Sequence, residues 1–166
     1  MKAQFLTPLR VEHVSGKWWR LTSALSYYSA LLDRVVTVPE KFVTDFASIP
    51  RVPIAYWLFG GRGNAPAVVH DAAYRWPIMD SRMQVDRVFN EALKAEGKWF
   101  TTRWPMTGAC ITVGWLAYKS IPGCLDIRRC RNTSPRCIDC HNYYPRWSNL
   151  IRQPSKRELE IISERD

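Results

Sequence analysis

The sequence lacks a long apolar run, a secretory signal and any internal repeat. Its most apolar stretch, residues 105–118, is shorter than the roughly 20 residues that a membrane-spanning helix requires. The first sixteen residues, MKAQFLTPLRVEHVSG, contain no continuous apolar segment followed by small residues, so we expect no signal peptide. The sequence therefore predicts no transmembrane segment and synthesis in a cytoplasm.

Acidic residues are scarce near the end of the chain. Between Lys119 and Arg157 there are nine Lys or Arg residues and only two acids, Asp126 and Asp139. This excess of basic over acidic residues accounts for most of the formal charge of +9. Such an excess favours association with polyanions such as nucleic acid, anionic lipid or lipopolysaccharide, although it says nothing about the fold.

Apolar residues are abundant enough for a globular core. Hydrophobic residues make up 46% of the 166 residues, and eight of them are Trp. This composition excludes an intrinsically disordered chain, and the length suits one ordinary domain with appendages. We predict a core domain over residues 1–119 and a Cys-rich, basic C-terminal extension over residues 120–166.

The order of the patterns predicts an α+β core. Short β-prone runs separated by turn-forming residues predict a small, mostly antiparallel sheet over residues 4–9, 17–22, 25–30, 34–38 and 42–45. About three helices should follow, over residues 65–77, 82–96 and 105–118. Ser81 and Gln84 fit a capping box at the start of the second, and Gly97 supplies its stop. A short charged helix over residues 156–164 is also expected.

The first two helices carry a polar constellation. His70 and Tyr74 are four residues apart and share one helix face, with Asp71 at its edge. The short connection between the helices should bring Asp86 of the second helix within reach of His70. A carboxylate bonded to one imidazole nitrogen leaves the other as a base toward water. We therefore predict His70, Asp86 and Tyr74 as candidate catalytic residues.

Asp71 is a candidate ligand for a hard cation such as calcium, with backbone carbonyls completing the shell. Three upstream glycines could offer such carbonyls: Gly60, Gly61 and Gly63. The alternative is purely structural, with His70 filling a helix contact and Asp71 paired with Arg75. The segment from Thr44 to Ser48 could aim polar groups at the same site, but a structural turn capped by Asp45 or Ser48 is the slightly favoured interpretation.

Three ordered motifs carry a resemblance. They are VPEKFVTDFASIPR at residues 38–51, HDAAY at residues 70–74 and DRVFNEAL at residues 86–93. Together they resemble a family of unknown function that is encoded widely by tailed bacteriophages and prophages, over about residues 5–118. The resemblance implies a phage origin without implying a reaction.

The His-Asp-x-x-Tyr helix followed by a helix bearing Asp is also similar to the catalytic helices of type-2 phospholipase A. That resemblance implies that His70 activates water, Asp86 orients His70, Asp71 binds calcium and Tyr74 supports the network. The similarity is short. The glycines lie closer to the His than the calcium loop of that family does, and its flanking half-cystines are absent from this helix.

Four cysteines fall within seventeen residues of the extension: Cys124, Cys130, Cys137 and Cys140. The Cys137-x-x-Cys140 spacing suits zinc, and His141 could replace one thiolate. Two disulfides are the competing interpretation, unliganded thiols come third, and the CxxCH haem pattern comes last. Cys110 stands apart in an apolar helix, where we expect a small buried hydrophobe.

These patterns lead to three functional hypotheses. The first is a virion-associated component of a tailed phage whose helix pair acts as a phospholipase-like hydrolase on host envelope lipid. The second is a non-catalytic structural or assembly protein that docks on other phage proteins through its basic tail. The third is a nucleic-acid-associated module, because aromatic residues such as Tyr143 and Trp147 are interleaved with the basic ones. We expect synthesis in the host cytoplasm and then a place in the virion.

Overall fold

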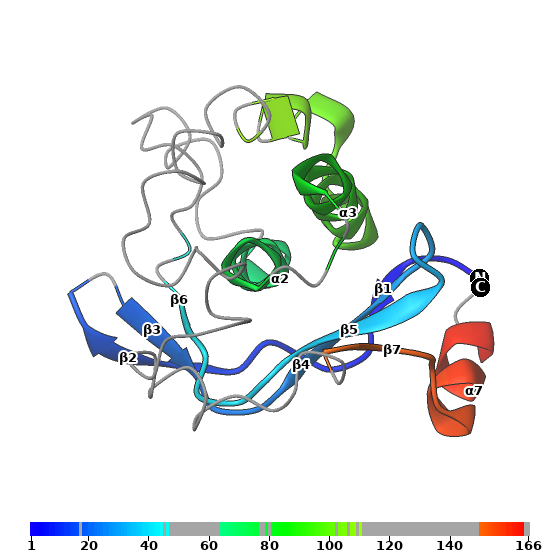
Figure 1. The fold of residues 1–166 in the computed structure, drawn as a ribbon, viewed down its shortest axis with the longest axis horizontal. Coiled ribbons are helices and arrows are strands. Elements are labelled where there is room, and N and C mark those ends of the chain that lie inside the picture. Colours follow the sequence, from blue (N-terminus) through cyan, green and yellow to red (C-terminus); the bar gives the residue numbers. More distant parts are fainter. Residues whose placement is uncertain are drawn as a thin grey trace, which may run out of the picture.

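The computed structural model describes residues 1–16, 18–44, 46, 64–76, 79, 81–101, 103–105, 107, 108, 110 and 150–164. Within these residues, antiparallel strands precede the helices, so the α+β class is confirmed. Figure 1 shows the strands as one layer, with α2 (Asn64–Arg75) and α3 (Arg82–Ala95) over one side of it and α7 (Lys156–Glu164) at the far end. Residues described between 100 and 110 are helical as well.

The strands form two sheets, where we expected one. The first sheet has the order β1 (Gln4–Phe5), β4 (Leu25–Ser29), β5 (Arg34–Val38) and β7 (Ile151–Arg152), and all its neighbours are antiparallel. The second sheet has the order β2 (Val11–Ser15), β3 (Trp18–Leu21) and β6 (Val43–Thr44). β2 was not predicted because four of its five residues are exposed, so it lacks the apolar alternation of a half-buried strand.

The centre of the first sheet is fully covered. All five residues of β4 are buried, and β5 buries three of its four Val and Thr side chains. Tyr27 and Val36 of these strands pack in the same apolar cluster as Val68 and Ala72 of α2. This cluster stabilises α2 against the sheet, since burial of each large apolar side chain is worth about 1.5–3 kcal/mol.

α3 begins and ends as the sequence predicts. The Ser81 hydroxyl accepts a hydrogen bond from the Gln84 amide at 3.2 Å and so caps the helix start. At the other end, the Gly97 amide donates to the Lys94 carbonyl and the Lys98 amide to the Leu93 carbonyl. Gly97 has a φ of 74°, which completes a Schellman motif that favours glycine. These caps determine which residues of α3 face α2.

The end of the chain contributes to the first sheet. β7 pairs with β5, placing Arg152 opposite Val35, and Leu150 lies in the main core at 2% exposure. Ile162 of α7 is fully buried against Tyr28 and Val35. The predicted helix over residues 156–164 is confirmed. The predicted boundary at residues 119 and 120 lies outside the described residues, but residues 150–164 pack on the core rather than apart from it.

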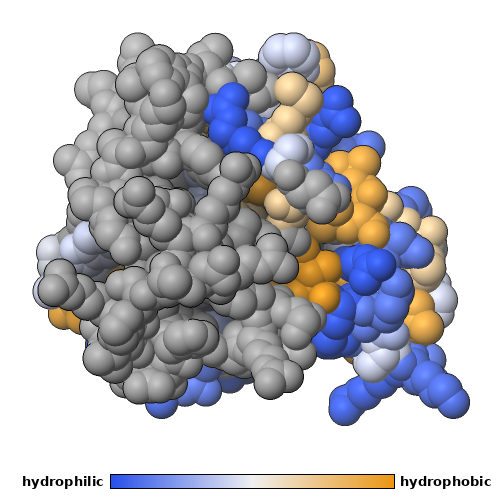
Figure 2. All heavy atoms as spheres, viewed as in Figure 1, coloured by the Kyte–Doolittle hydropathy of each residue, from blue (hydrophilic) through white to orange (hydrophobic). Residues whose placement is uncertain are grey.

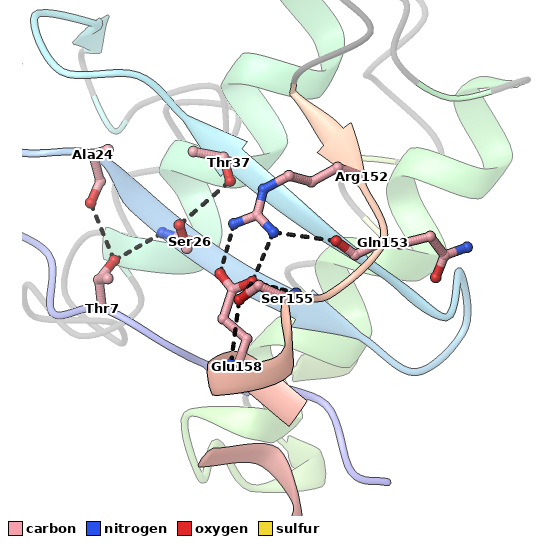
Figure 3. A network of polar contacts seen from close by, with 8 residues as sticks. All are labelled: Thr7, Ala24, Ser26, Thr37, Arg152, Gln153, Ser155 and Glu158. Atoms are coloured by element: carbon pink, nitrogen blue, oxygen red, sulfur yellow. Dashed lines mark hydrogen bonds and ion pairs between the residues drawn. The ribbon is translucent and has the colours of Figure 1, made fainter. Parts of the chain in front are cut away.

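A polar network joins β7 to α7 (Figure 3). Both terminal guanidinium nitrogens of Arg152, Nη1 and Nη2, donate to the Glu158 carboxylate at 2.6 Å. Ser155 and Glu158 form a capping box, because the Ser155 amide donates to Glu158 Oε2 at 2.8 Å while the Glu158 amide donates to Ser155 Oγ. The network therefore holds the last helix at a definite angle to the last strand.

Candidate functional site

The predicted helix pair forms as expected. α2 and α3 pack against each other, and the HDAAY motif lies on α2 while the DRVFNEAL motif lies on α3. Pro66 lies in the first turn of α2, where a missing amide hydrogen costs little. Val85, Val88 and Phe89 form part of the buried face of α3, which also carries Asp86. The apolar stripe thus turns Asp86 toward α2.

Asp86 connects the two helices through a single carboxylate oxygen. His70 Nε2 lies 3.1 Å from Asp86 Oδ1, and the Tyr74 hydroxyl donates to the same oxygen at 2.7 Å. A carboxylate that accepts from Nε2 keeps the hydrogen on that nitrogen, so the lone pair of the neutral ring is on Nδ1. The geometry predicted for these three residues is therefore present, and in this tautomer Nδ1 is the basic atom of the ring.

Aromatic rings hold His70 in position. The centroid of the His70 ring lies 4.2 Å from that of Tyr74 and 4.7 Å from that of Phe89. His70 is 4% exposed and Asp86 is 2% exposed. In such a low-dielectric environment each hydrogen bond of the pair is stronger than it would be in water. The orientation of the imidazole is thus determined by packing as well as by Asp86.

Tyr74 serves as a hydrogen-bond donor. Burial raises the pKa of the Tyr74 hydroxyl far above its usual range, and the hydrogen bond to the Asp86 carboxylate raises it further. Because the hydroxyl stays protonated, it cannot act as a base at neutral pH. Tyr74 is therefore a positioning residue for Asp86 and not a residue that transfers protons, which refines the catalytic role predicted for it.

Asp71 is joined to the second sheet. The Thr44 hydroxyl at the end of β6 donates to Asp71 Oδ2 at 2.7 Å, and the same hydroxyl accepts from the Phe46 amide at 3.1 Å. The predicted contribution of the Thr44 to Ser48 segment thus exists at Thr44, while Asp45 and Ser48 lie outside the described residues. Phe46 has a φ of 51°, which marks a tight turn directly after the contact.

The remaining predicted ligands are outside the described part of the chain. These are Gly60, Gly61, Gly63, Cys124, Cys130, Cys137, Cys140 and His141. Among the residues that are described, no group of three His, Cys, Asp or Glu side chains is placed to hold a metal ion. Calcium at Asp71 and zinc at the cysteine cluster stay predictions.

Cys110 is buried at 1% exposure beside Phe89 and Leu93, as expected for a small apolar side chain. Burial raises the pKa of its thiol to about 12, with the Asp86 carboxylate contributing in the same direction. At neutral pH this thiol is protonated and therefore a poor nucleophile. Cys110 thus packs against the helix pair and contributes no reactive group to it.

Glu91 is an anchoring residue that sequence reasoning missed. Its carboxylate accepts from the Tyr27 hydroxyl at 2.9 Å, the Ser29 hydroxyl at 2.6 Å and the Leu31 amide at 2.9 Å. These donors come from β4 and the turn after it, about sixty residues earlier in the chain. No local pattern could indicate a pairing across that separation. Through these bonds Glu91 sets the position of α3 over the first sheet.

A groove of about 740 Å³ runs along the outer face of α3. Its lining includes Asp86, and also the exposed basic side chains of Arg87 and Lys94. Thr107 closes one part of it and accepts a hydrogen bond from the Asn90 amide at 2.8 Å. Asp86, which orients His70, is thus among the residues around a hollow large enough for part of a small molecule.

None of the described helices is both long and apolar enough to span a membrane.

Comparison with known proteins identifies a family without a reaction. No curated protein matches this chain, and no protein of solved structure does. A family model described as "Protein of unknown function (DUF1353)" matches residues 19–110, more than half of the 166 residues. The match includes both helices of the site and β6, which bonds to it. The chain therefore belongs to the DUF1353 family of proteins of unknown function.

Proposed function

We propose that this protein is a hydrolase of a tailed bacteriophage in which His70 acts as general base, with the phospholipid of the host envelope as substrate. The observation that carries the proposal is the bond of 3.1 Å between His70 Nε2 and Asp86 Oδ1, with Tyr74 on the same oxygen. This arrangement matches the roles implied by the resemblance to type-2 phospholipase A. The virion location and the phage origin rest on the resemblance of the three motifs.

The proposed reaction is hydrolysis of a carboxylic ester. His70 Nδ1 accepts a proton from water as the water oxygen attacks the ester carbonyl carbon, and Asp86 stabilises the imidazolium that forms. The bond from that carbon to the alcohol oxygen then breaks, and the imidazolium returns its proton to the leaving oxygen. A fatty acid and a lysophospholipid result. The proton taken from water is held on Nδ1 and is delivered from there to the leaving oxygen, so Asp86 stays ionised throughout.

Asp71 is the proposed calcium ligand. A bound calcium ion would polarise the ester carbonyl. Asp71 Oδ2 accepts a hydrogen bond from the Thr44 hydroxyl at 2.7 Å. This bond fixes the orientation of the carboxylate that would bind calcium. Calcium dependence of the rate, tested by chelation with EGTA and restoration with calcium, checks this part separately from the role of His70.

The test is release of fatty acid from phospholipid by the wild type and by His70→Gln. His13→Gln is the matched control, because His13 is exposed on β2, away from the helix pair, where its ring bonds to the Gly16 carbonyl and packs against Trp19. We expect His70→Gln to lower kcat by about 10²- to 10⁴-fold, as for loss of a general base, and His13→Gln to leave it unchanged. Equal rates for wild type and His70→Gln, with both proteins folded by circular dichroism, would refute the hydrolase.

A structural role is the second candidate, and the burial of the pair favours it. His70, Asp86 and Thr44 are 4%, 2% and 1% exposed, so the bonds that they make connect α2, α3 and β6 inside the protein. In that case Tyr74→Phe lowers the free energy of unfolding by about 1 kcal/mol, as expected for one buried hydrogen bond. The same substitution separates the two candidates at a temperature where Tyr74→Phe stays folded. A hydrolase would lose rate of fatty acid release, whereas a structural protein would show only the loss of stability.

A further inference from the structure

Three large aromatic side chains lie exposed just after α3. Trp99 is 77% exposed, Phe100 60% and Trp104 62%; we call these three residues the aromatic patch. The rings of Phe100 and Trp104 lie 6.1 Å apart, so the two form one continuous apolar surface. Apolar side chains scattered singly over a surface need no explanation, but a contiguous group of large ones marks an interaction site.

The helical residues that follow α3, which include Phe100 and Trp104, lie on the side of α3 away from the sheets. In Figure 1 the helical residues after α3, in yellow-green, lie at the top of the view, with α3 between them and the strands. The patch therefore cannot be a part of the sheet core that is poorly packed. Figure 2 shows, in the same view, hydrophobic atoms at the surface beside strongly hydrophilic ones on the right-hand side of the molecule.

The aromatic patch is close in the chain to Thr107, which lines the groove beside Asp86. Trp104 and Thr107 are both helical residues three positions apart, so they lie within about one helical turn of each other. Thr107 lines the groove, which brings the groove to within that distance of Trp104. Two further exposed apolar side chains line the same groove: Leu31 is 60% exposed and Met83 is 62% exposed. Exposed apolar surface thus extends from the aromatic patch to the neighbourhood of Asp86.

Basic side chains accompany this apolar surface. Arg87 and Lys94 are exposed and line the groove, one on each side of Asn90 along α3. Two acidic residues of α3 also line the groove: Glu91 accepts three hydrogen bonds from β4 and its turn, and Asp86 accepts from His70 and Tyr74. The outer charge around the groove is therefore positive, in keeping with the formal charge of +9 of the chain. Trp beside basic residues is typical of surfaces that lie at the headgroup level of a membrane.

We propose that the aromatic patch inserts into the headgroup region of an anionic phospholipid bilayer, with Arg87 and Lys94 contacting lipid phosphates. Docked in this way, the groove beside Asp86 opens onto the bilayer, and Leu31 and Met83 contact the acyl part of a lipid. This docking would bring the proposed hydrolase to its substrate, so the reason for docking rests on the proposed function. Binding to the bilayer does not itself require catalysis. Anionic lipid is favoured over neutral lipid because of the basic side chains.

The test is co-sedimentation of the full chain with vesicles of phosphatidylglycerol and phosphatidylcholine, compared with vesicles of phosphatidylcholine alone. The variant Trp99→Ser/Phe100→Ser/Trp104→Ser removes the patch. Trp18→Ser is the matched control, since Trp18 is 39% exposed and lies on β3 in the second sheet. We expect the triple variant to lose partitioning into anionic vesicles by about a hundredfold or more. Trp18→Ser should bind as the wild type does.

The outcomes separate this inference from the hydrolase. Equal partitioning of the triple variant and the wild type overturns the docking surface, whatever the hydrolysis rate. So does a patch that instead pairs two copies of the chain, seen as a dimer that the triple variant abolishes without any vesicle binding. His70→Gln should bind vesicles as the wild type does. Patch-dependent binding by a wild type that releases no fatty acid would uphold the docking surface and refute only the hydrolase.

Discussion

Single residues in this protein receive several hydrogen bonds each. Asp86 accepts from His70 and Tyr74 on one oxygen, and Glu91 accepts from Tyr27, Ser29 and Leu31. Both carboxylates lie on α3, five residues apart, but they serve different neighbours. Asp86 faces α2 and the candidate site, whereas Glu91 faces β4. The sequence of α3 shows only that acidic residues interrupt an apolar face. The neighbours decide which of them meets His70 and which anchors α3 to β4.

Glu158 makes the stability of the C-terminal end depend on pH. Its hydrogen bonds from Arg152 lower the pKa of the Glu158 carboxyl from 4.5 to about 2. Because the folded-state pKa is depressed, the contribution is complete above about pH 4.5 and is lost as the pH falls toward 2. Both side chains are partly solvated, so we expect a contribution of about 1 kcal/mol or less.

The measurement is urea denaturation of the wild type and Glu158→Gln at pH 7, 4 and 2.5. The difference between them should be largest at pH 7 and shrink toward pH 2.5. A difference that stays constant over this range would show that the charge of Glu158 does not contribute.

Among the elements, α3 has the clearest local signals. Its start at Ser81 and its stop at Gly97 were both readable, since capping uses residues within one turn of the helix end. The bounds of the strands were less readable: β1 and β6 lie within the predicted runs 4–9 and 42–45 but have only two residues each, and β2, which is mostly exposed, was not predicted. A strand of that length is stabilised by its partner rather than by its own pattern.

Gly97 and Gly108 allow the C-terminal stop of α3 to be tested. A Cβ at either glycine would meet no atom within 4 Å, so steric contact is the same in both. Only Gly97 has a positive φ, of 74°. We expect Gly97→Ala to lower the free energy of unfolding by about 1 kcal/mol, and Gly108→Ala, within a helix, to raise it by about 0.5–1 kcal/mol. Thermal or urea denaturation checks both, and equal effects would contradict the Schellman stop.

In the whole molecule, the chain's last described segment completes the sheet that its first residues begin. β7 pairs with β5, and the side chain of Gln4 on β1 donates to the Ile162 carbonyl of α7 at 3.3 Å. Residues about 160 positions apart are therefore neighbours. Residues 150–164 of the predicted extension over residues 120–166 thus belong to the core structure, while its cysteine cluster lies outside the described residues.

Ile162 and Leu159 test whether this segment stabilises the whole fold. Ile162 is fully buried against Tyr28 and Val35, while Leu159, on the same helix, is 39% exposed. We expect Ile162→Ala to lower the free energy of unfolding of the entire protein by about 2–4 kcal/mol and Leu159→Ala by much less. A single cooperative transition, followed by tryptophan fluorescence and circular dichroism, should shift for Ile162→Ala. An early separate transition of α7 alone would show that α7 is not part of the cooperative core.

The sequence alone determined the α+β class, the helix pair and the meeting of His70, Tyr74 and Asp86. These follow from helical periodicity, caps and a short connection, all of which act between residues close together in the chain. Only the tertiary structure decided that Thr44 bonds to Asp71, that Glu91 anchors α3 and that β7 and α7 join the first sheet. Those contacts join residues from 27 to more than 100 positions apart, and only the packing of complete elements brings such residues together.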